Sequence, residues 1–218
     1  MSLLLLYGTA LLVGSVHALE PDHMAAVTSF AVRRPRWRDA VRFGIRWAAG
    51  HGAAIVLVGT CMLLVGLRFP DAATEWLERG VGVVLVGLGA WTIRGAKRLH
   101  AHRHVHRDGT VHAHVHSHAI VEDHEHRHAA TVVGVLHGLA GTAPAVALVP
   151  ITNFESPAAG VLYLVLFAVG TACGMALYAL LAGFLVGRGA FRSERTARTL
   201  AIVTGCVTMA VGVLWLGR

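Results

Sequence analysis

The chain has 218 residues, of which 55% are hydrophobic and only 14% are charged, whereas a soluble domain carries about a quarter charged residues. Its 25 glycines follow no Gly-X-Y period, which excludes collagen, and the apolar content excludes a disordered chain and a soluble enzyme. The formal net charge is +7. In a membrane protein a basic excess marks inner loops rather than nucleic-acid binding, so we predict an integral membrane protein without a nucleic-acid partner.

Apolar stretches long enough to cross a bilayer recur along the chain. A transmembrane helix needs about 20 apolar residues. Six stretches predict six helical spans, which are Ser2–Leu19, Trp47–Leu67, Val81–Ile93, Ala129–Ile151, Ala158–Gly187 and Thr199–Gly217. We expect the short third span to extend backwards through Trp76 and forwards towards Leu99. The fifth is long enough to tilt or to contain a re-entrant turn. The expected fold class is an all-α membrane protein.

The basic residues predict the orientation of these spans. Sixteen of the 19 Lys and Arg residues lie in three segments, Arg33–Arg46, Arg94–Arg127 and Arg188–Arg198. If all six spans cross, these segments share one side of the membrane, and Arg68, Arg79 and Arg218 lie on the other. By the positive-inside rule we expect a multi-pass protein of the cell (inner) membrane, with both termini outside and the basic segments in the cytoplasm.

Short similarities indicate two related halves. Val16–Leu19 in the first span reads Val-His-Ala-Leu, and Leu136–Leu139 in the fourth reads Leu-His-Gly-Leu. Each is followed by a proline, Pro21 or Pro144. With an odd number of spans per half, the second half crosses the membrane in the opposite orientation to the first. We therefore expect two inverted three-helix repeats. The predicted organisation is a first repeat at residues 1–99, a polar loop at 100–128 and a second repeat at 129–218.

Ionisable side chains gather in the first span, in the run from His17 to His23. Placing each ionisable side chain inside a bilayer costs a few kcal/mol of free energy, so a group of them indicates a functional site. Pro21 lacks a backbone donor and its ring clashes with the His17 carbonyl, so we expect a discontinuous helix with that carbonyl freed as a further ligand. In a regular helix His17 and His23 would point about 120° apart. A break lets His17, Asp22 and His23 converge. We expect Glu20 to support a ligand without binding the metal, or to lie at the membrane interface.

Two further histidines lie in other spans. His51 stands between two glycines in the second span, and His137 precedes Gly138 in the fourth. A glycine beside a histidine allows another backbone or a partly hydrated ion to approach closely. Imidazole and carboxylate together suit Ni, Co, Zn or Fe better than Mg or Ca. The sequence therefore predicts a midplane metal site, and its ligands are His17, Asp22, His23, His51 and His137. The choice among the four metals stays open.

A histidine-rich tract separates the two halves. Its 11 histidines are His100, His102, His104, His106, His112, His114, His116, His118, His124, His126 and His128. Such a tract cannot build a core, so we expect a solvated cytoplasmic insert without fixed structure. Asp108-Gly109 indicates a turn. A two-residue hairpin there would pair His106 with Val111, and it would place the four histidines of 100–106 and the four of 112–118 on opposite faces. We predict capture of ions beside the pore, weakening as pH falls through about 6.5 because imidazole binds metal only when neutral.

The motif His17-x4-Asp22-His23, with Gly50-His51-Gly52 in the second span, resembles the nickel/cobalt transporters (NiCoT and the wider NicO group). Those families share an H-x4-D-H signature and a histidine in the second helix. The stretch His137–Pro144 resembles shorter, urease-accessory-like members, and the histidine-rich loop is similar to that of nickel/cobalt exporters. The resemblance implies alternating-access transport of Ni²⁺ or Co²⁺ as substrate, no permanently bound cofactor, and a cytoplasmic metallochaperone as a candidate partner.

The chain also departs from these families. Val16 stands where uptake permeases have Arg, Glu20-Pro21 stands where they have Asp-Ala, and six spans fit rather than eight. Exporters tend to have Gly where this chain has Asp22. The loop favours export and Asp22 favours uptake, so the direction of transport stays open.

Other classes fit the residues less well. A membrane thiol–disulfide carrier has six spans and inverted halves, but it needs a reactive cysteine near the proline of each half, where this chain has His17 and His137. An exporter of organic or sulfur anions needs positive groups in its pore, whereas these spans offer Glu20 and Asp22. An intramembrane metalloenzyme is disfavoured because no H-E-x-x-H motif occurs. We therefore expect a transporter and not an enzyme. Because the sequence has no ATP-binding P-loop, we expect an ion gradient or a partner to supply the energy for transport.

Overall fold

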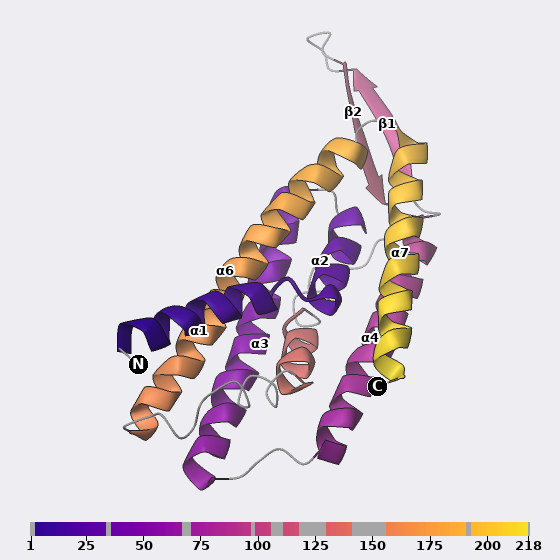
Figure 1. The fold of residues 1–218 in the computed structure, drawn as a ribbon. Coiled ribbons are helices and arrows are strands. Elements are labelled where there is room, and N and C mark those ends of the chain that lie inside the picture. The colour runs from indigo at the N-terminus through magenta and orange to yellow at the C-terminus, as the bar shows by residue number, and fades with distance from the viewer. Residues whose placement is uncertain are drawn as a thin grey trace.

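The part of the chain that the structure describes is almost entirely helical, with one two-stranded sheet (Figure 1). The computed structural model describes residues 3–33, 36–66, 71–96, 99–105, 111–117, 130–140, 156–190 and 193–217. Its helices are α1 (Leu3–His17), α2 (Pro21–Arg33), α3 (Trp37–Val65), α4 (Asp71–Ala96), an unlabelled short helix (Ala130–Ala140), α6 (Pro157–Ala190) and α7 (Glu194–Leu216).

Four of these helices, α3, α4, α6 and α7, are long and apolar enough to cross a membrane. The bent pair of α1 and α2 raises the number to five if it counts as one span. This confirms a helical, multi-pass membrane protein, whereas six spans and two inverted repeats stay predictions. Of the fourth predicted span, Ala129–Ile151, the structure describes the helix Ala130–Ala140. Residues 141–155 lie outside the described residues.

The predicted break in the first helix is present. The axes of α1 and α2 differ by 54° across a short break. Pro21 is the first residue of α2, a position where its missing N–H is not needed and its fixed φ suits the helix. The predicted release of the His17 carbonyl is wrong, because that oxygen accepts a hydrogen bond from the Glu20 N–H at 3.0 Å.

Several predicted boundaries shift. The helix α3 begins at Trp37, ten residues before the predicted start, so part of the arginine-rich segment continues the membrane helix. Arginine is a good helix former, which permits this extension. The third predicted span does extend backwards through Trp76, since α4 begins at Asp71. The helix α6 is continuous over 34 residues, so the alternative of a re-entrant turn in the fifth span is wrong.

Close helix packing depends on glycine faces. A Cβ added to Gly170 or Gly174 of α6 would collide with the α1 backbone at Leu11 or Ser15. Between α4 and α7, Gly82 lies against Gly212 and Gly89 lies against Gly205, so these two helices run antiparallel. Small residues let helix backbones approach closely in lipid. The helix α2 packs against α3, α4, α6 and α7, and Figure 1 shows it in the middle of the bundle.

The histidine-rich segment contains the sheet. Strands β1 (Leu99–Val105) and β2 (Val111–Ser117) pair antiparallel, and in Figure 1 they extend from beside α7 past the ends of α6 and α7. The register pairs histidine with histidine: His100 with His116, His102 with His114 and His104 with His112. The strands correct the expected lack of structure, and their register differs by one residue from that of a two-residue hairpin, in which His106 would pair with Val111. Such a slip changes every cross-strand partner. The other five histidines of the tract lie outside the described residues.

Candidate metal centre

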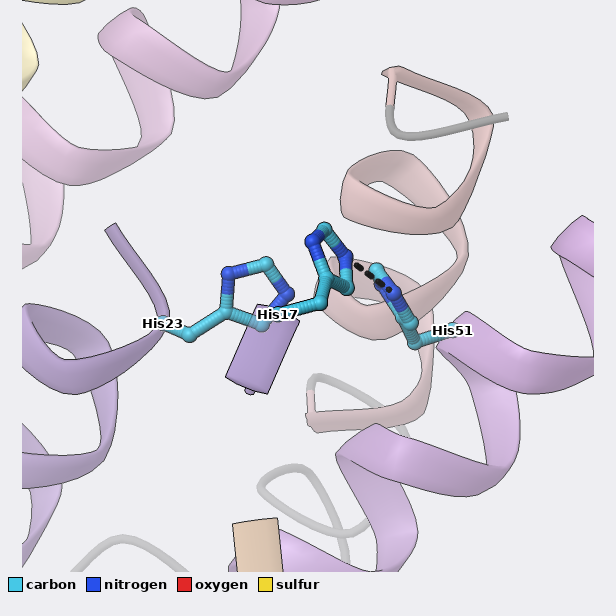
Figure 2. A group of neighbouring side chains, drawn as sticks. All are labelled: His17, His23 and His51. Atoms are coloured by element: carbon cyan, nitrogen blue, oxygen red, sulfur yellow. Dashed lines mark hydrogen bonds between the residues drawn. The ribbon is translucent and has the colours of Figure 1, made fainter. Parts of the chain in front are cut away.

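Three histidines from three helices meet at the break between α1 and α2 (Figure 2). His17 ends α1, His23 lies in the first turn of α2, and His51 lies within α3. One ring nitrogen of each lies within 4.8 Å of those of the other two. The Nε2 atoms of His17 and His51 are 3.2 Å apart. Two nitrogens each about 2.1 Å from one ion, at an angle of about 100°, have this separation.

Carboxylates fix which nitrogen of two of these rings is available. The Nδ1 of His17 lies 2.8 Å from Glu20 Oε1, and the Nδ1 of His23 lies 3.1 Å from Asp22 Oδ1. A carboxylate can only accept, so each Nδ1–H donates and each Nε2 keeps its lone pair. Metal-binding histidines have this arrangement, in which the outer nitrogen donates to a carboxylate and the inner one holds the ion.

Burial leaves several of these nitrogens without a partner. His23 and His51 are 2% and 1% exposed. Among the described residues, His23 Nε2 and His51 Nδ1 find no hydrogen-bond partner. Leaving a buried polar atom unsatisfied costs about 1–3 kcal/mol. A cation bound to His23 Nε2 would remove this cost, so the donor set suits a borderline transition-metal ion.

Asp22 connects this trio to His137. Its Oδ2 lies 3.7 Å from His137 Nε2, and both side chains are buried. The Nδ1 of His137 donates to the Val133 carbonyl at 3.1 Å, so in a neutral ring the Nε2 lone pair faces the Asp22 carboxylate. A cation between the two groups would remove that repulsion. His137 is thus close to the centre but outside the trio of histidines.

Glycines bring His51 and His137 together. A Cβ on Gly138 would collide with the backbone oxygen of His51, and one on Gly50 would collide with that of Thr131. The sequence predicted a close approach of a backbone or an ion at these glycines. In the structure the backbone approaches, and the helix Ala130–Ala140 lies directly against α3 as a result.

Two aromatic residues of the site were not predicted from the sequence. Trp47 is fully buried and stacks on His23, with ring centroids 5.6 Å apart and planes inclined by 6°. The same indole meets His137 edge-on at 4.9 Å. Phe167 of α6 lies 5.4 Å from the His17 ring. The only signal for Trp47 is its position four residues before His51, which places both on one face of α3.

A family model described as "Cytochrome C biogenesis protein transmembrane region" matches residues 9–214. The chain belongs to this family. No solved structure matches the chain.

Three relatives align along most of the chain, each at less than 30% identity. "Urease accessory protein UreH" of Bacillus sp. (strain TB-90) is 28% identical over 206 residues, covering 92% of this chain and 86% of UreH. "Chloroplast protein FOR GROWTH AND FERTILITY 1" of Arabidopsis thaliana is 28% identical over 209 residues, covering 94% of this chain and 57% of that protein. "Putative nickel/cobalt efflux system MJ1092" of Methanocaldococcus jannaschii is 23% identical over 218 residues, covering 96% and 91%. The names of the first and third relatives confirm the resemblance to the nickel/cobalt transporter families.

Proposed function

We propose that this chain is a transporter that carries Ni²⁺ or Co²⁺ across the cell membrane. The observation that carries the proposal is the convergence of His17, His23 and His51 with the Nε2 atoms of His17 and His51 3.2 Å apart. The two relatives named for urease accessory function and nickel/cobalt efflux support the same substrates. The ion is the transported substrate in this proposal, and no permanently bound cofactor is required.

In this proposal His17, Asp22, His23, His51 and His137 form the substrate site. The three imidazoles supply nitrogen ligands, and the buried Asp22 supplies negative charge between His23 and His137. Nitrogen and oxygen donors of this kind favour Ni²⁺ and Co²⁺ over Mg²⁺ and Ca²⁺. Three neutral imidazoles also place less negative charge around the cation than three carboxylates would. The cation is therefore held less tightly and can be released after it has crossed.

The break between α1 and α2 supports alternating access. It lies between His17 and His23, so a change in the 54° bend would move these two ligands relative to each other. The helix α1 packs on α6, whereas α2 also packs on α4 and α7. Rocking of these two groups of helices about the break would open the site to one side at a time. We propose an ion gradient as the energy source.

The histidine-rich hairpin serves this function as a capture surface on the cytoplasmic side. Its register sets three histidine pairs opposite one another along β1 and β2, and a cytoplasmic metallochaperone is a fitting partner for exchange there. In this scheme the basic segments face the cytoplasm and both termini face outward. Residues 1–99 and 129–218 form two inverted repeats around the site.

Metal accumulation in cells with and without the protein tests substrate and direction together. Higher cellular nickel or cobalt indicates uptake, and lower cellular metal indicates efflux. In reconstituted vesicles, His17→Ala and Asp22→Asn should each abolish flux. Thr92→Val is the matched control, because Thr92 is buried on α4 and its hydroxyl donates, among the residues that the structure describes, to the Leu88 carbonyl of its own helix. Normal flux in both site variants would remove these residues from the mechanism.

The family match is compatible with one second candidate, the thiol–disulfide carrier already considered from the sequence. That chemistry needs two cysteines that can approach each other. The three cysteines of this chain, Cys61, Cys173 and Cys206, are free and exposed on α3, α6 and α7. The positions near the prolines hold His17 and His137 instead. We therefore propose metal transport as the function.

A further inference from the structure

The break between α1 and α2 carries a second group of possible ligands beside the three histidines. Donor atoms of Glu20, Asp22 and His23 also lie within 4.8 Å of one another. This group shares His23 with the histidine trio, but it offers two carboxylates and one imidazole instead of three imidazoles. The two groups therefore differ in chemistry while they share one ring.

His23 is placed to serve both groups. Its Nδ1 lies 3.1 Å from Asp22 Oδ1, whereas its Nε2 has no hydrogen-bond partner among the described residues although the ring is buried. The ring centroid lies 4.8 Å from that of His17 and 4.9 Å from that of His51. The Nδ1 of this imidazole thus faces Asp22, and it can bind a cation there once its proton has moved to Nε2, the nitrogen left without a partner.

One member of this second group, Glu20, faces the surface. The Glu20 side chain is 46% exposed, whereas those of Asp22 and His23 are 4% and 3% exposed. The junction of α1 and α2 lies near the middle of the height of α3 and α6 in Figure 1. A charged carboxylate exposed to lipid at that depth is costly. We therefore expect water to reach Glu20, which makes this group the entrance to the buried histidines.

We propose that Glu20, Asp22 and His23 form a second cation position, which faces water and exchanges its ion with the buried position at His17, His23 and His51. This inference rests on the proposed function. Oxygen donors suit an ion that is still partly hydrated, and imidazoles suit the same borderline ion once it has lost water. Glu20 Oε1 lies 2.8 Å from His17 Nδ1, so a carboxylate that leaves His17 to take the ion also loosens a ligand of the inner position.

Transport kinetics test the role of Glu20. Glu20→Gln keeps the size of the side chain but removes its charge, and it should raise the KM for Ni²⁺ or Co²⁺ flux in vesicles about tenfold, the effect of losing a supporting carboxylate at a metal site. The matched control is Glu75→Gln, which removes an exposed glutamate on α4 that pairs with Arg79. An unchanged KM in Glu20→Gln would overturn the proposal.

Binding to the purified protein separates this proposal from transport itself. In His51→Ala the inner position loses one ligand, and Co²⁺ should still bind, with X-ray absorption showing more oxygen and less nitrogen around the metal. Adding Glu20→Ala to His51→Ala should then weaken the remaining binding at least tenfold. Equal Co²⁺ affinity in the single and double variants would overturn the second position. Failure of the unsubstituted protein to move metal would reject the proposed transport but leave this binding result readable.

Discussion

His17 and His51 are 34 positions apart in the sequence, yet their Nε2 atoms lie 3.2 Å apart. Each ring comes from a different helix, and His17 is oriented by Glu20 through its other nitrogen. Because that Nδ1–H already donates to a carboxylate, the Nε2 facing His51 carries the lone pair. The Nε2–H of His51 therefore donates to the Nε2 of His17, and a cation that takes the place of that proton would be bound by both rings.

Replacement of His51 should weaken metal binding more than replacement of His137. His51 belongs to the trio whose ring nitrogens lie within 4.8 Å of one another, whereas His137 lies outside that trio and its Nε2 is 3.7 Å from Asp22 Oδ2. We expect His51→Ala to lower the Co²⁺ affinity of the purified protein by at least about tenfold and His137→Ala by less. Titration followed by the visible absorption of bound Co²⁺ measures both. Equal losses in the two variants would place His137 among the direct ligands.

Gly138→Ala should destabilise the protein. A Cβ there would collide with the His51 backbone oxygen and approach the Ala54 Cβ at 2.8 Å. Overpacking of this kind costs about 1–3 kcal/mol, so the unfolding temperature in detergent should fall. Gly87→Ala is the control, because a Cβ at Gly87 meets nothing within 4 Å. That change should be neutral or stabilising, since alanine favours helix over glycine by about 1 kcal/mol. A stable Gly138→Ala would mean that α3 and the helix Ala130–Ala140 can separate freely.

Arg33→Ala should lower stability through the contact between α2 and α4. The Arg33 guanidinium lies 3.3 Å above the centroid of the Trp91 ring, and its Nη1 donates to the Trp91 carbonyl at 2.6 Å. We expect a loss of about 1–2 kcal/mol in the free energy of unfolding, measured by denaturant titration in detergent. Arg79, whose guanidinium lies 5.5 Å from the Trp76 ring at the surface, provides the control. Arg79→Ala should change the same free energy by less than about 0.5 kcal/mol, and a comparable loss there would deny Arg33 a special role.

Removal of all three cysteines should leave metal flux intact. Cys61, Cys173 and Cys206 are exposed and free, and none belongs to either group of candidate ligands. We expect the triple alanine variant to transport Ni²⁺ or Co²⁺ in vesicles at the rate of the unsubstituted protein. His17→Ala in the same preparation sets the level of an inactive site. Loss of flux in a folded cysteine-free variant would instead favour thiol–disulfide chemistry.

Much of the site was predictable because its signals are local. Asp22, His23, His51 and His137 are functional candidates because each is a charged or imidazole side chain within an apolar stretch. This inference does not depend on how the helices pack. Pro21 cannot lie in a helix interior without disrupting it, so the break after His17 was also predictable. The apolar content and the distribution of Lys and Arg likewise indicate a multi-pass membrane protein without reference to tertiary contacts.

Other features depend on contacts that the sequence does not encode locally. Trp47 resembles an ordinary apolar residue until its ring is seen stacked on His23. The predicted free carbonyl of His17 was wrong, because the turn through Glu20 supplies it with a donor. The histidine pairs of β1 and β2 follow from the strand register, which changes completely with a shift of one residue.

The membrane class, the break at Pro21 and the donor types that suit a transition metal follow from local sequence, because hydrophobicity, proline geometry and ligand chemistry belong to individual residues and their neighbours. The meeting of the ends of α1 and α2 with the middle of α3, the exposure of Glu20 and the membership of His23 in both groups are visible only in the folded chain. That arrangement depends on glycine faces of distant helices packing backbone against backbone, and no local pattern specifies which faces will meet.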